Sequence, residues 1–571
     1  MIEISNLTLP LTKLDGTPET ERNAIRALVL RRLHVAPDDL LGVELRRRSI
    51  DARKKSVVHL TYTVRAQLRA GEQAERAALA RLARRHDDRG VRLVMEAAPT
   101  LPARVVRAVG SRPVVVGAGC AGLFCALALA SAGLEPVLVE RGDDATRRTE
   151  AVRRFDATGE LDPESNIQFG VGGAGTFSDG KLTTGTKSPL HRLVLETFVA
   201  AGAQPEIAWD AKPHIGSDVL PDVVEAICRR IRELGGEVRT RTRLTGIELA
   251  DDAMSPAQDS CAAAGRSRRV RAVRLERCEP SGLLVEERLA TSQLVLACGH
   301  SARDVFELLR DLGVTLERKT FAMGVRIEHL QAMVDRAQFG PAAGHPALGA
   351  APYKLVSHLP SGRSAYSFCM CPGGYVVAAA SDPGGVVTNG MSLAARAGTN
   401  ANSGLLANVL PTDLPGDDPL AGVALQRQCE RAAFELGGGG YVAPAQLVGD
   451  FLRGTPTTGG AGDVAPTYPR GVAWGSVEGC LPPYVTETLR AAIPDMARHL
   501  RGFDAADAVL TGVESRSSSP VRVTRGADLQ SAAVAGLYPC GEGAGYAGGI
   551  MSAATDGIRV AEAIVAAYAE P

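Results

Sequence analysis

Residues 114–141 read VVVGAGCAGLFCALALASAGLEPVLVER, and no charged residue stands between Val114 and Leu134. A stretch of this kind is either a membrane span or a buried strand, turn and helix. A membrane span must be continuously helical. Here a β-branched run ends at Gly117, a helical apolar pattern ends at Gly133, and PVLVE forms a second β run. The stretch therefore predicts a βαβ unit with a glycine-rich turn after its first strand.

The turn has the G-x-G-x-x-G spacing of a dinucleotide-binding fingerprint, with Gly117, Gly119 and Gly122. The first glycine allows a tight turn, the second lets the backbone approach a pyrophosphate, and the third allows close packing of helix on strand. The helix N-terminus offers free N–H groups to the phosphates. Glu140 ends the second strand, where its carboxylate can accept ribose hydroxyls and would repel the 2′-phosphate of NADP. The same predicted site includes Cys120, Ala121 and Arg141.

The composition is typical of a soluble protein with several domains, since 571 residues are too many for a single core. Lys and Arg together number 64, as do Asp and Glu, so no net charge draws the chain toward nucleic acid or a membrane surface. The 11 cysteines, following a start without a signal-peptide pattern, predict free thiols and a cytoplasmic location.

The stretch GLYPCGEGAGYAGGIMSAATDG (536–557) has the pattern of a strand, a glycine loop and a helix. It resembles FAD enzymes of the glutathione-reductase-like superfamily, in which an acidic residue, usually Asp where this chain has Glu542, bonds the ribityl and pyrophosphate region. The last helix of those enzymes points its N-terminus at the flavin, where it stabilises the negative charge of the reduced ring. QLVLACGHSARD (293–304) and GGEVRTRTRLTGI (235–247) resemble two more FAD-contacting strands. The resemblance implies FAD contacts by Gly541, Glu542, Gly549, Ile550, Cys298, Gly299 and Leu244.

A second resemblance covers essentially the whole chain. NIQFGVGGAGTFSDGKLTT (166–184), FAMGVRIEH (321–329), YSFCMCPGGYVVAAAS (366–381) and ESRSSSPVR (514–522) resemble an FAD-dependent dehydrogenase family of bacteria and plastids. That family is known mainly by its fold, so the resemblance implies no substrate. It implies that a second glycine loop lies beside the flavin ring, with Gly172, Gly173, Thr176 and Ser178 as cofactor-binding residues.

We therefore expect an α/β protein with four parts. Residues 1–105 follow the order β-α-β-β-α-β, which predicts a ferredoxin-like α+β module. Residues 113–304 and 510–571 are expected to form a Rossmann-like FAD-binding domain of glutathione-reductase type. Residues 305–509 are expected to form an inserted α+β substrate or cap domain, and 251–269 predict an insertion at a hairpin tip.

Four side chains are candidates for the chemistry, and each has a structural alternative. Lys181 can reach flavin N5 or N1/O2, or it can be solvated. His300 can act as an acid or base, or hydrogen-bond the backbone at a turn. Arg516 can hold a substrate carboxylate, or pair with Glu514. Tyr546 can donate a proton, or stack.

Two further features are less specific. Cys369 and Cys371 form C-x-C, which can be a redox dithiol, but residues i and i+2 of a strand face the same way and more often pack as small apolar groups. No cysteine or histidine cluster stands at metal spacing beside them, so we predict no metal site. The basic run Arg46–Arg48 with Arg53, Lys54 and Lys55 allows an RNA-binding hypothesis, but RNA-binding sheets display aromatic residues and this run has none.

Together these features predict an FAD-dependent oxidoreductase that transfers hydride between flavin N5 and an unidentified small organic substrate. FAD fills the one full fingerprint, so NAD(P)H is expected only as a transient electron donor. We expect neither nucleic acid nor membrane as a partner, and the oligomeric state stays open. Two alternatives remain: a flavin-dependent RNA-modifying enzyme that uses the N-terminal module, and a non-catalytic flavin redox sensor.

Overall fold

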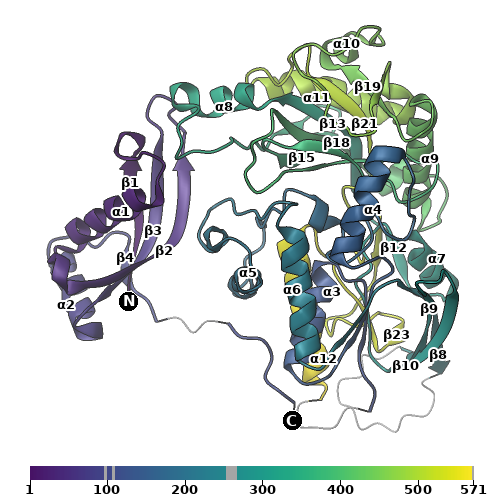
Figure 1. Ribbon diagram of the computed structural model, residues 1–571, viewed down its shortest axis with the longest axis horizontal. Coiled ribbons are helices and arrows are strands. Elements are labelled where there is room, and N and C mark those ends of the chain that lie inside the picture. The colour runs from purple at the N-terminus through teal and green to yellow at the C-terminus, as the bar shows by residue number, and fades with distance from the viewer. Residues whose placement is uncertain (96–98, 106–109, 252–265, 569–571) are drawn as a thin grey trace.

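The computed structural model describes residues 1–95, 99–105, 110–251 and 266–568. Its chain forms an N-terminal module, a body built on a parallel sheet, and a second sheet region above that body (Figure 1). Most of the predicted hairpin insertion, 251–269, lies outside the described residues.

The N-terminal module is one antiparallel sheet with the strand order β2-β3-β1-β4. Helix α1 begins where the sequence predicts, because Pro18 is its first residue and the Thr17 hydroxyl accepts the Thr20 N–H. The elements in chain order are β1 Ile2–Pro10, α1 Pro18–Leu33, β2 Leu40–Asp51, β3 His59–Leu68, α2 Gly71–Arg84 and β4 Val91–Leu93, with short 3-10 turns at Leu11–Lys13 and Pro37–Asp39.

The body contains a five-stranded sheet with the order β24-β11-β5-β6-β7, in which every neighbouring pair is parallel. Its central strands are apolar on both faces, as expected for a sheet covered on both sides. Val115 packs with the helices on one face, and Val114 and Val116 pack with an antiparallel sheet on the other. The strands are β5 Val114–Val116, β6 Val137–Val139, β7 Glu237–Arg239, β11 Leu294–Leu296 and β24 Leu537–Pro539.

Helices α3 and α12 lie side by side on the helical face (Figure 1), where Gly557 of α12 approaches the Ala121 carbonyl so closely that a Cβ there would lie 2.1 Å from it. The segment 235–247, which the sequence analysis treats as a strand, contains β7 and the start of β8, because the chain turns at Arg241 (φ 50°) and passes from one sheet to the other. The remaining body elements are α3 Cys120–Ser131, α4 Ala145–Thr158, α5 Leu190–Ala200, α6 Leu220–Glu233, α7 Arg303–Asp311, α12 Ile550–Ala566, β8 Thr242–Asp251, β9 Arg268–Cys278, β10 Leu284–Ala290 and β23 Val534–Ala535, with 3-10 turns at Ala174–Phe177 and Pro205–Ala208.

The upper region, which we call the cap, is built on a seven-stranded sheet with the order β14-β15-β18-β13-β21-β19-β20. The predicted domain boundary at 509/510 falls at the start of β21, yet β21 pairs with β13 and β19 in the cap sheet. The chain therefore returns to the body only after Glu514. The cap strands are β13 Phe321–Leu330, β14 Val356–His358, β15 Ser364–Cys371, β18 Asn400–Val409, β19 Ala443–Leu447, β20 Val472–Trp474 and β21 Val509–Glu514.

Smaller elements complete the cap and join it to the body. Strand β12 Leu316–Arg318 pairs with β22 Val521–Val523, and β16 Tyr375–Ala378 forms a hairpin with β17 Thr388–Met391. The cap helices are α8 Gln331–Phe339, α9 Ala421–Leu436, α10 Val448–Arg453 and α11 Pro483–Ala497, with 3-10 turns at Gly340–Ala342, Pro411–Asp413 and Val477–Cys480.

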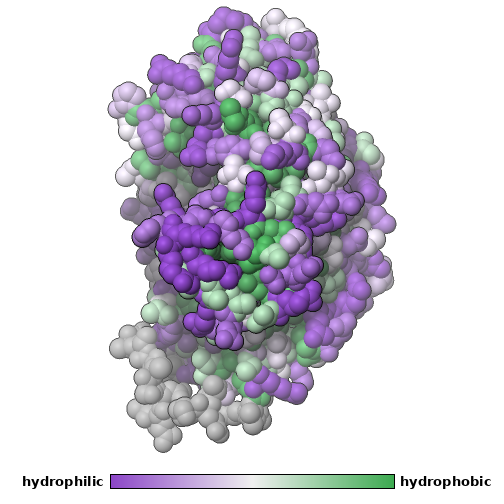
Figure 2. All heavy atoms as spheres, turned by 90° about the vertical axis from the view of Figure 1, so that its left-hand side faces the viewer, coloured by the Kyte–Doolittle hydropathy of each residue, from purple (hydrophilic) through white to green (hydrophobic). Residues whose placement is uncertain are grey.

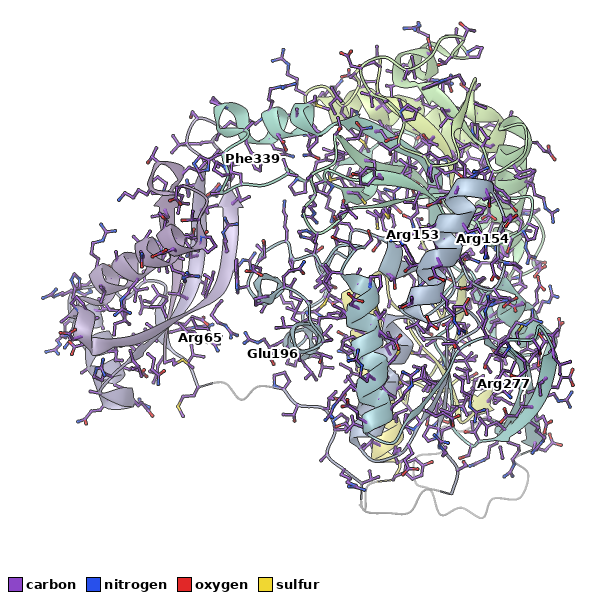
Figure 3. All side chains as sticks on the ribbon, in the orientation of Figure 1. Arg65, Arg153, Arg154, Glu196, Arg277 and Phe339 are labelled. Carbon is purple, nitrogen blue, oxygen red and sulfur yellow. The ribbon has the colours of Figure 1, made fainter. Side chains whose placement is uncertain are left out.

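The N-terminal module contacts both other parts. Its apolar core is continuous with that of the cap, near Phe339 of α8 (Figure 3). Its edge strand β2 meets the body through two backbone bonds, from Arg48 N–H to the Trp209 carbonyl (2.8 Å) and from Ala211 N–H to the Arg48 carbonyl (2.8 Å). Arg65 and Glu196 lie on the two sides of this junction (Figure 3). The outward face of the module is largely hydrophilic, with small apolar patches (Figure 2).

Candidate functional site

The first glycine turn has the geometry that its three glycines predict. Gly117 has φ 98°, and a Cβ on it would lie 2.4 Å from the Ala297 carbonyl oxygen. A Cβ on Gly122 would lie 1.8 Å from the carbonyl oxygen of Gly117, so only glycine allows helix α3 to pack this closely. Gly119 caps α3 without a side-chain acceptor, so the first N–H groups of the helix stay available.

The second glycine loop lies directly against the first. Gly119 and Gly172 form a parallel β-bridge, and a Cβ on Gly173 would lie 3.0 Å from the Gly119 Cα. Thr176 is 1 % exposed, and its hydroxyl has no hydrogen-bond partner among the described residues. Ser178 stays in its own loop, where its hydroxyl donates to the Gly175 carbonyl (2.6 Å).

Glu140 joins these two loops. Its Oε2 accepts the N–H of Ala118 (2.8 Å), and its Oε1 accepts the N–H groups of Gly142 (3.0 Å) and Gly170 (2.9 Å). The carboxylate is 5 % exposed and therefore acts as a buried anchor of both loops. The sequence pattern does not predict this backbone role.

Arg141 turns away from the loops. Its guanidinium bonds Glu164 (2.8 Å) and Asp304 (3.0 Å) and lies 4.2 Å from the ring centre of Phe169. Leu244 packs in the apolar core between the two sheets, so its side chain does not face the glycine turns.

The C-terminal loop reaches the same place. A Cβ on Gly541 would lie 2.8 Å from the Ala121 Cβ, and a Cβ on Gly175 would lie 3.3 Å from the Ile550 side chain. Gly549 begins α12 without a side-chain cap, and its N–H donates to Glu542 (3.4 Å). Burial raises the pKa of the Glu542 carboxyl to about 7. Three segments far apart in the chain thus meet around two uncapped helix N-termini.

His300 lies beside this meeting point. Its Nε2 is 4.0 Å from Glu542 Oε1, and its buried Nδ1 has no partner among the described residues. Burial, helped by the charges of Arg516 and Arg303, lowers the pKa of His300 to about 3, so the ring is neutral at neutral pH. The two residues before it, Cys298 and Gly299, precede α7, and burial raises the pKa of the Cys298 thiol to about 12.

Arg516 has a different partner from the one predicted. Its guanidinium makes a bidentate pair with Glu430, with bonds of 2.9 Å from Nε and 2.8 Å from Nη2. Arg303 bonds the same carboxylate (2.7 Å), and all three side chains are about 2 % exposed. We call Arg303, Arg516 and Glu430 the clasp, because it ties α7 of the body to α9 and the segment after β21. The predicted Arg516–Glu514 pair is absent, since Glu514 bonds Arg326 instead (3.0 Å).

Tyr546 also has a local partner. Its hydroxyl accepts the N–H of Arg525 (3.1 Å), and the Arg525 guanidinium lies 4.0 Å from the ring centre. The side chain is 37 % exposed. This geometry agrees with the stacking alternative.

Lys181 lies just beyond the second glycine loop, in an antiparallel bridge with His214. Its surroundings include the buried Asp179, which pairs with Arg396 (2.9 Å). Lys181 is thus near the glycine loop in the chain but belongs to a neighbouring cluster of charged side chains.

The expectation for Cys369 and Cys371 is wrong in one respect. Strand β15 bulges between Phe368 and Cys371, and Cys369 has φ 40°. As a result Cys369 is exposed while Cys371 is buried, so the two side chains do not share one environment. Both thiols are free, and burial by surrounding protein raises the pKa of each.

Three of the six residues in the basic run of the N-terminal module form ion pairs. Arg46 bonds Glu44 (2.8 Å), Arg48 bonds Glu21 (2.7 Å), and Arg53 pairs with Asp51. Within the described ranges, no cluster of three or more His, Cys, Asp or Glu is placed to hold a metal ion. None of the helices in those ranges has the length and apolarity to cross a membrane.

Several residues of the site escaped prediction. Arg303 and Arg326 lie in the quoted stretches 293–304 and 321–329 but have no role there, and Glu430 lies in none of the quoted stretches; the structure pairs Arg303 with Glu430 and Arg326 with Glu514 over long distances in sequence. Lys319 is another: the charges of Glu542 and Arg522 act on it, and burial lowers the pKa of its ammonium group. The sequence signal for such buried pairs is a charged residue in an otherwise apolar segment, such as Arg326 in β13.

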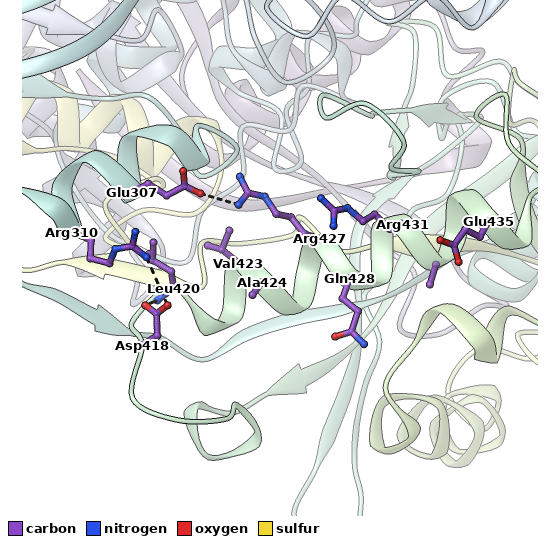
Figure 4. Close-up of a pocket in the computed structure, with 11 residues that line it drawn as sticks. Glu307, Arg310, Asp418, Leu420, Val423, Ala424, Arg427, Gln428, Arg431 and Glu435 are labelled. Atoms are coloured by element: carbon purple, nitrogen blue, oxygen red, sulfur yellow. Dashed lines mark hydrogen bonds and ion pairs between the residues drawn. The ribbon is translucent and has the colours of Figure 1, made fainter.

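A pocket of about 580 Å³ lies apart from the glycine turns, on the outer side of α9. Its walls carry charged side chains that largely satisfy each other, such as Glu307 with Arg427 (2.8 Å; Figure 4). It has neither a glycine turn nor an unpaired buried polar group, so it does not compete with the site above.

Family models match three parts of the chain. Residues 320–517 match a "FAD-dependent protein, C-terminal domain-like" model, 112–154 match an "FAD binding domain" model, and 1–67 match a domain of unknown function. Among solved structures, the chain is 10% identical to a flavoprotein/dehydrogenase from Cytophaga hutchinsonii, over 80% of this chain and 77% of that one, with a TM-score of 0.34. It is 16% identical to aklavinone-11 hydroxylase, over 54% of this chain and 47% of that one, with a TM-score of 0.23. Both TM-scores are low, so these likenesses identify neither a substrate nor a reaction.

A relative found by its sequence matches the whole length of this chain. An uncharacterized protein of Clostridium beijerinckii is 41% identical over 572 aligned residues, which is 100% of this chain and 99% of that protein. The chain therefore belongs to one family with the Clostridium beijerinckii protein, and its matched domains make this an FAD-dependent family.

Proposed function

We propose that the protein is an FAD-dependent oxidoreductase that transfers hydride between flavin N5 and a small organic substrate. The observation that carries the proposal is the convergence of three glycine segments, shown by the Gly119–Gly172 bridge and the contact of Gly541 with Ala121. A flavin ring and a diphosphate must lie close to the protein backbone, and the glycines leave the backbone uncovered at this point. The N-termini of two helices also meet there.

The same proposal includes the domain assignment. Residues 113–304 and the segment after Glu514 form the FAD-binding domain of glutathione-reductase type, the residues from 305 to Glu514 the substrate domain, and 1–105 a ferredoxin-like module. The parallel sheet between helices and an antiparallel sheet supports the first assignment, and the strand order β2-β3-β1-β4 supports the last.

The residues present fit FAD. The N–H groups at the start of α3, including those of Cys120 and Ala121, would hold the diphosphate. Glu140 Oε2 has a single backbone partner, which leaves a lone pair for a ribose hydroxyl. The unpaired hydroxyl of Thr176 and the Gly549 end of α12 would face the ring. When bound, FAD supplies a two-electron hydride acceptor or donor.

The protein's own contribution to chemistry centres on His300. A neutral imidazole can donate a hydrogen bond from its ring N–H to the substrate or to the flavin edge, whereas a pKa of about 3 makes it a weak proton acceptor at neutral pH. The clasp lies next to it, and the positive charges of Arg303 and Arg516 keep the ring neutral. Arg516 acts as a positioning residue here, because its guanidinium already donates two hydrogen bonds to Glu430.

We also propose a cytoplasmic protein to which reduced NAD(P)H binds only transiently as electron donor, without nucleic acid or membrane partners. The pairing of Arg46, Arg48 and Arg53 within the N-terminal module supports the view that this basic run is not an RNA-binding face.

The test is the flavin content of the purified protein. We expect a yellow protein whose released cofactor is FAD, and bleaching of its absorbance under anaerobic conditions by a reductant drawn from NADH, NADPH and metabolite pools. Gly173→Ala, which adds a Cβ 3.0 Å from backbone at φ 64°, should lose the cofactor. Gly185→Ala, which meets nothing within 4 Å, should keep it. A protein that stays colourless after addition of FAD would overturn the proposal.

A further inference from the structure

One arginine of helix α4 is enclosed by the segment that leads into the second glycine loop. Arg148 is 0 % exposed, whereas Arg153 of the same helix is exposed (Figure 3). The Arg148 guanidinium donates to four backbone carbonyls: from Nε to Asn166 (2.8 Å), from Nη2 to Ile167 (2.8 Å), and from Nη1 to Gly170 (3.3 Å) and Val171 (2.8 Å). One side chain thus holds both ends of the segment 166–171.

The positive charge of Arg148 is satisfied by neutral groups. All four acceptors are carbonyls, and no carboxylate in the described part of the chain forms an ion pair with this guanidinium. The Phe177 ring adds a cation–π contact, with its centre 4.9 Å from the Arg148 Cζ. Burial lowers the pKa of Arg148 to about 10 and the charge of Glu140 opposes it, so the group is charged at neutral pH. A buried charge without an ionic partner is costly, and an anion bound nearby would recover part of that cost.

Gly170 connects this arginine to the glycine loops. A Cβ on Gly170 (φ 123°) would lie 2.3 Å from the Arg148 Cδ, so only glycine lets the side chain pass. The Gly170 N–H donates to Glu140 (2.9 Å), and the Gly170 carbonyl accepts both from Arg148 and from the N–H of Gly173 (2.9 Å). Gly173 lies against Gly119, where the two loops meet. Arg148 is therefore linked through a single carbonyl to the point where the loops touch.

We propose that Arg148 is a positioning residue with two tasks: it holds the second glycine loop in the shape that receives the flavin, and its buried charge favours the reduced, negatively charged flavin over the oxidised one. This role rests on the proposed function, which puts the second glycine loop beside the flavin ring. Arg148 acts through the loop, since every hydrogen bond it makes ends on a backbone carbonyl. At an effective dielectric constant of about 20, a unit charge changes such an equilibrium by about tenfold at a separation of about 12 Å.

The experiment measures the two-electron midpoint potential of FAD bound to the full-length protein, at saturating FAD, by anaerobic titration against dyes of known potential. Arg148→Met keeps a long, adaptable side chain against Phe177 and removes the charge. It should lower the ratio of the affinities for reduced and oxidised FAD by about tenfold, which lowers the potential by about 30 mV. Arg153→Met removes an exposed arginine from the same helix and should leave the potential unchanged.

Arg148→Lys separates the charge from the shape. A lysine carries its donors on one nitrogen, so it cannot reach carbonyls at both ends of the segment 166–171 as the planar guanidinium does. FAD affinity, followed by flavin fluorescence, should therefore fall about tenfold or more in Arg148→Lys and in Arg148→Met. Burial lowers the pKa of the introduced amine, so its charge is lost as pH rises through that value. The potential of Arg148→Lys should equal that of the wild type at low pH and fall toward that of Arg148→Met at high pH.

The outcomes distinguish this role from the proposed function. Equal potentials in the wild type, Arg148→Met and Arg148→Lys across the pH series would overturn the electrostatic task, and equal FAD affinities would overturn the task of shaping the loop. Either result leaves the proposed function standing, because FAD is still bound. If Arg148→Met does not fold, the pH dependence of Arg148→Lys decides alone. A wild-type protein that binds no FAD overturns the proposed function and this role with it.

Discussion

The glycine segments and the clasp hold the same site from two sides, and they do so by opposite means. On the body side, Gly119, Gly172 and Gly541 bring bare backbone together, so contact is made by atoms that every residue has. Where the body meets the cap, Arg303, Arg516 and Glu430 bury full charges that bond one another. The glycine contacts require that no side chain stands at these positions, whereas each charge of the clasp requires an oppositely charged partner. They should therefore fail differently when a single residue is changed.

The largest effect is expected from removal of the shared carboxylate. Glu430→Gln leaves the two buried guanidinium groups with the partly exposed Asp382 as their remaining counter-charge, 2.7 Å from Arg303 and 3.3 Å from Arg516. Breaking a buried pair of this kind costs about 3–5 kcal/mol of the free energy of unfolding. Urea unfolding monitored by circular dichroism measures it. Asp311→Asn, at an exposed pair with Arg310, is the control and should change the stability by less than about 0.5 kcal/mol. A stable Glu430→Gln protein would mean that the clasp is dispensable.

A pH series sharpens the same comparison. Burial disfavours the charge on Glu430, but Arg516 and Arg303 outweigh it and lower the pKa of this carboxyl from 4.5 to about 2. A lowered folded-state pKa stabilises the protein above the unfolded value, and that stabilisation is lost as pH falls toward 2. The stability gap between wild type and Glu430→Gln should therefore be full at pH 7 and narrow between pH 4.5 and pH 2. A gap that stays constant over that range would contradict an ionised Glu430.

A substitution in the glycine segments should cost less unfolding free energy than Glu430→Gln and should release more of the bound FAD. Gly122→Ala places a Cβ 1.8 Å from the Gly117 carbonyl oxygen, so helix and turn must separate. We expect a cost of about 1–3 kcal/mol in unfolding free energy, as for other overpacked sites, together with loss of bound FAD. Gly475→Ala, which has open space around it, is the matched control. Full FAD retention by Gly122→Ala would show that the turn is not where the cofactor binds.

The smallest effect is expected at Tyr546. Tyr546→Phe removes one hydrogen bond, to the N–H of Arg525, and keeps the ring under the Arg525 guanidinium. The cost should be about 0.5–1.5 kcal/mol. Once a reductant is known, the rate of flavin reduction should equal that of the wild type. A fall of tenfold or more in that rate would restore Tyr546 as a proton donor.

The difference between the two sides also explains what could be predicted from the sequence. The β5–α3–β6 unit and the start of α12 follow local rules, because a strand, a glycine and an apolar helical period lie next to each other in the chain. Glu140 was recognised by position, but its bonds to Ala118 and Gly170 depend on how two loops meet. For Arg516 the sequence leaves a substrate carboxylate and the nearby Glu514 as alternatives, whereas its partner Glu430 lies 86 residues away. Pairing over such distances leaves no local pattern.

The contact between β2 and the body has a consequence for how the chain can be divided. Strand β2 is an outer strand of its sheet, and at Arg48 its open hydrogen-bonding side is covered by the backbone of Trp209 and Ala211. A protein shortened to begin near residue 113 would expose that donor and acceptor beside Lys212, next to a newly uncovered apolar surface of the cap. Contiguous exposed apolar surface of this kind favours association with other chains. The first hundred residues thus protect the rest of the molecule from self-association, whatever else they bind.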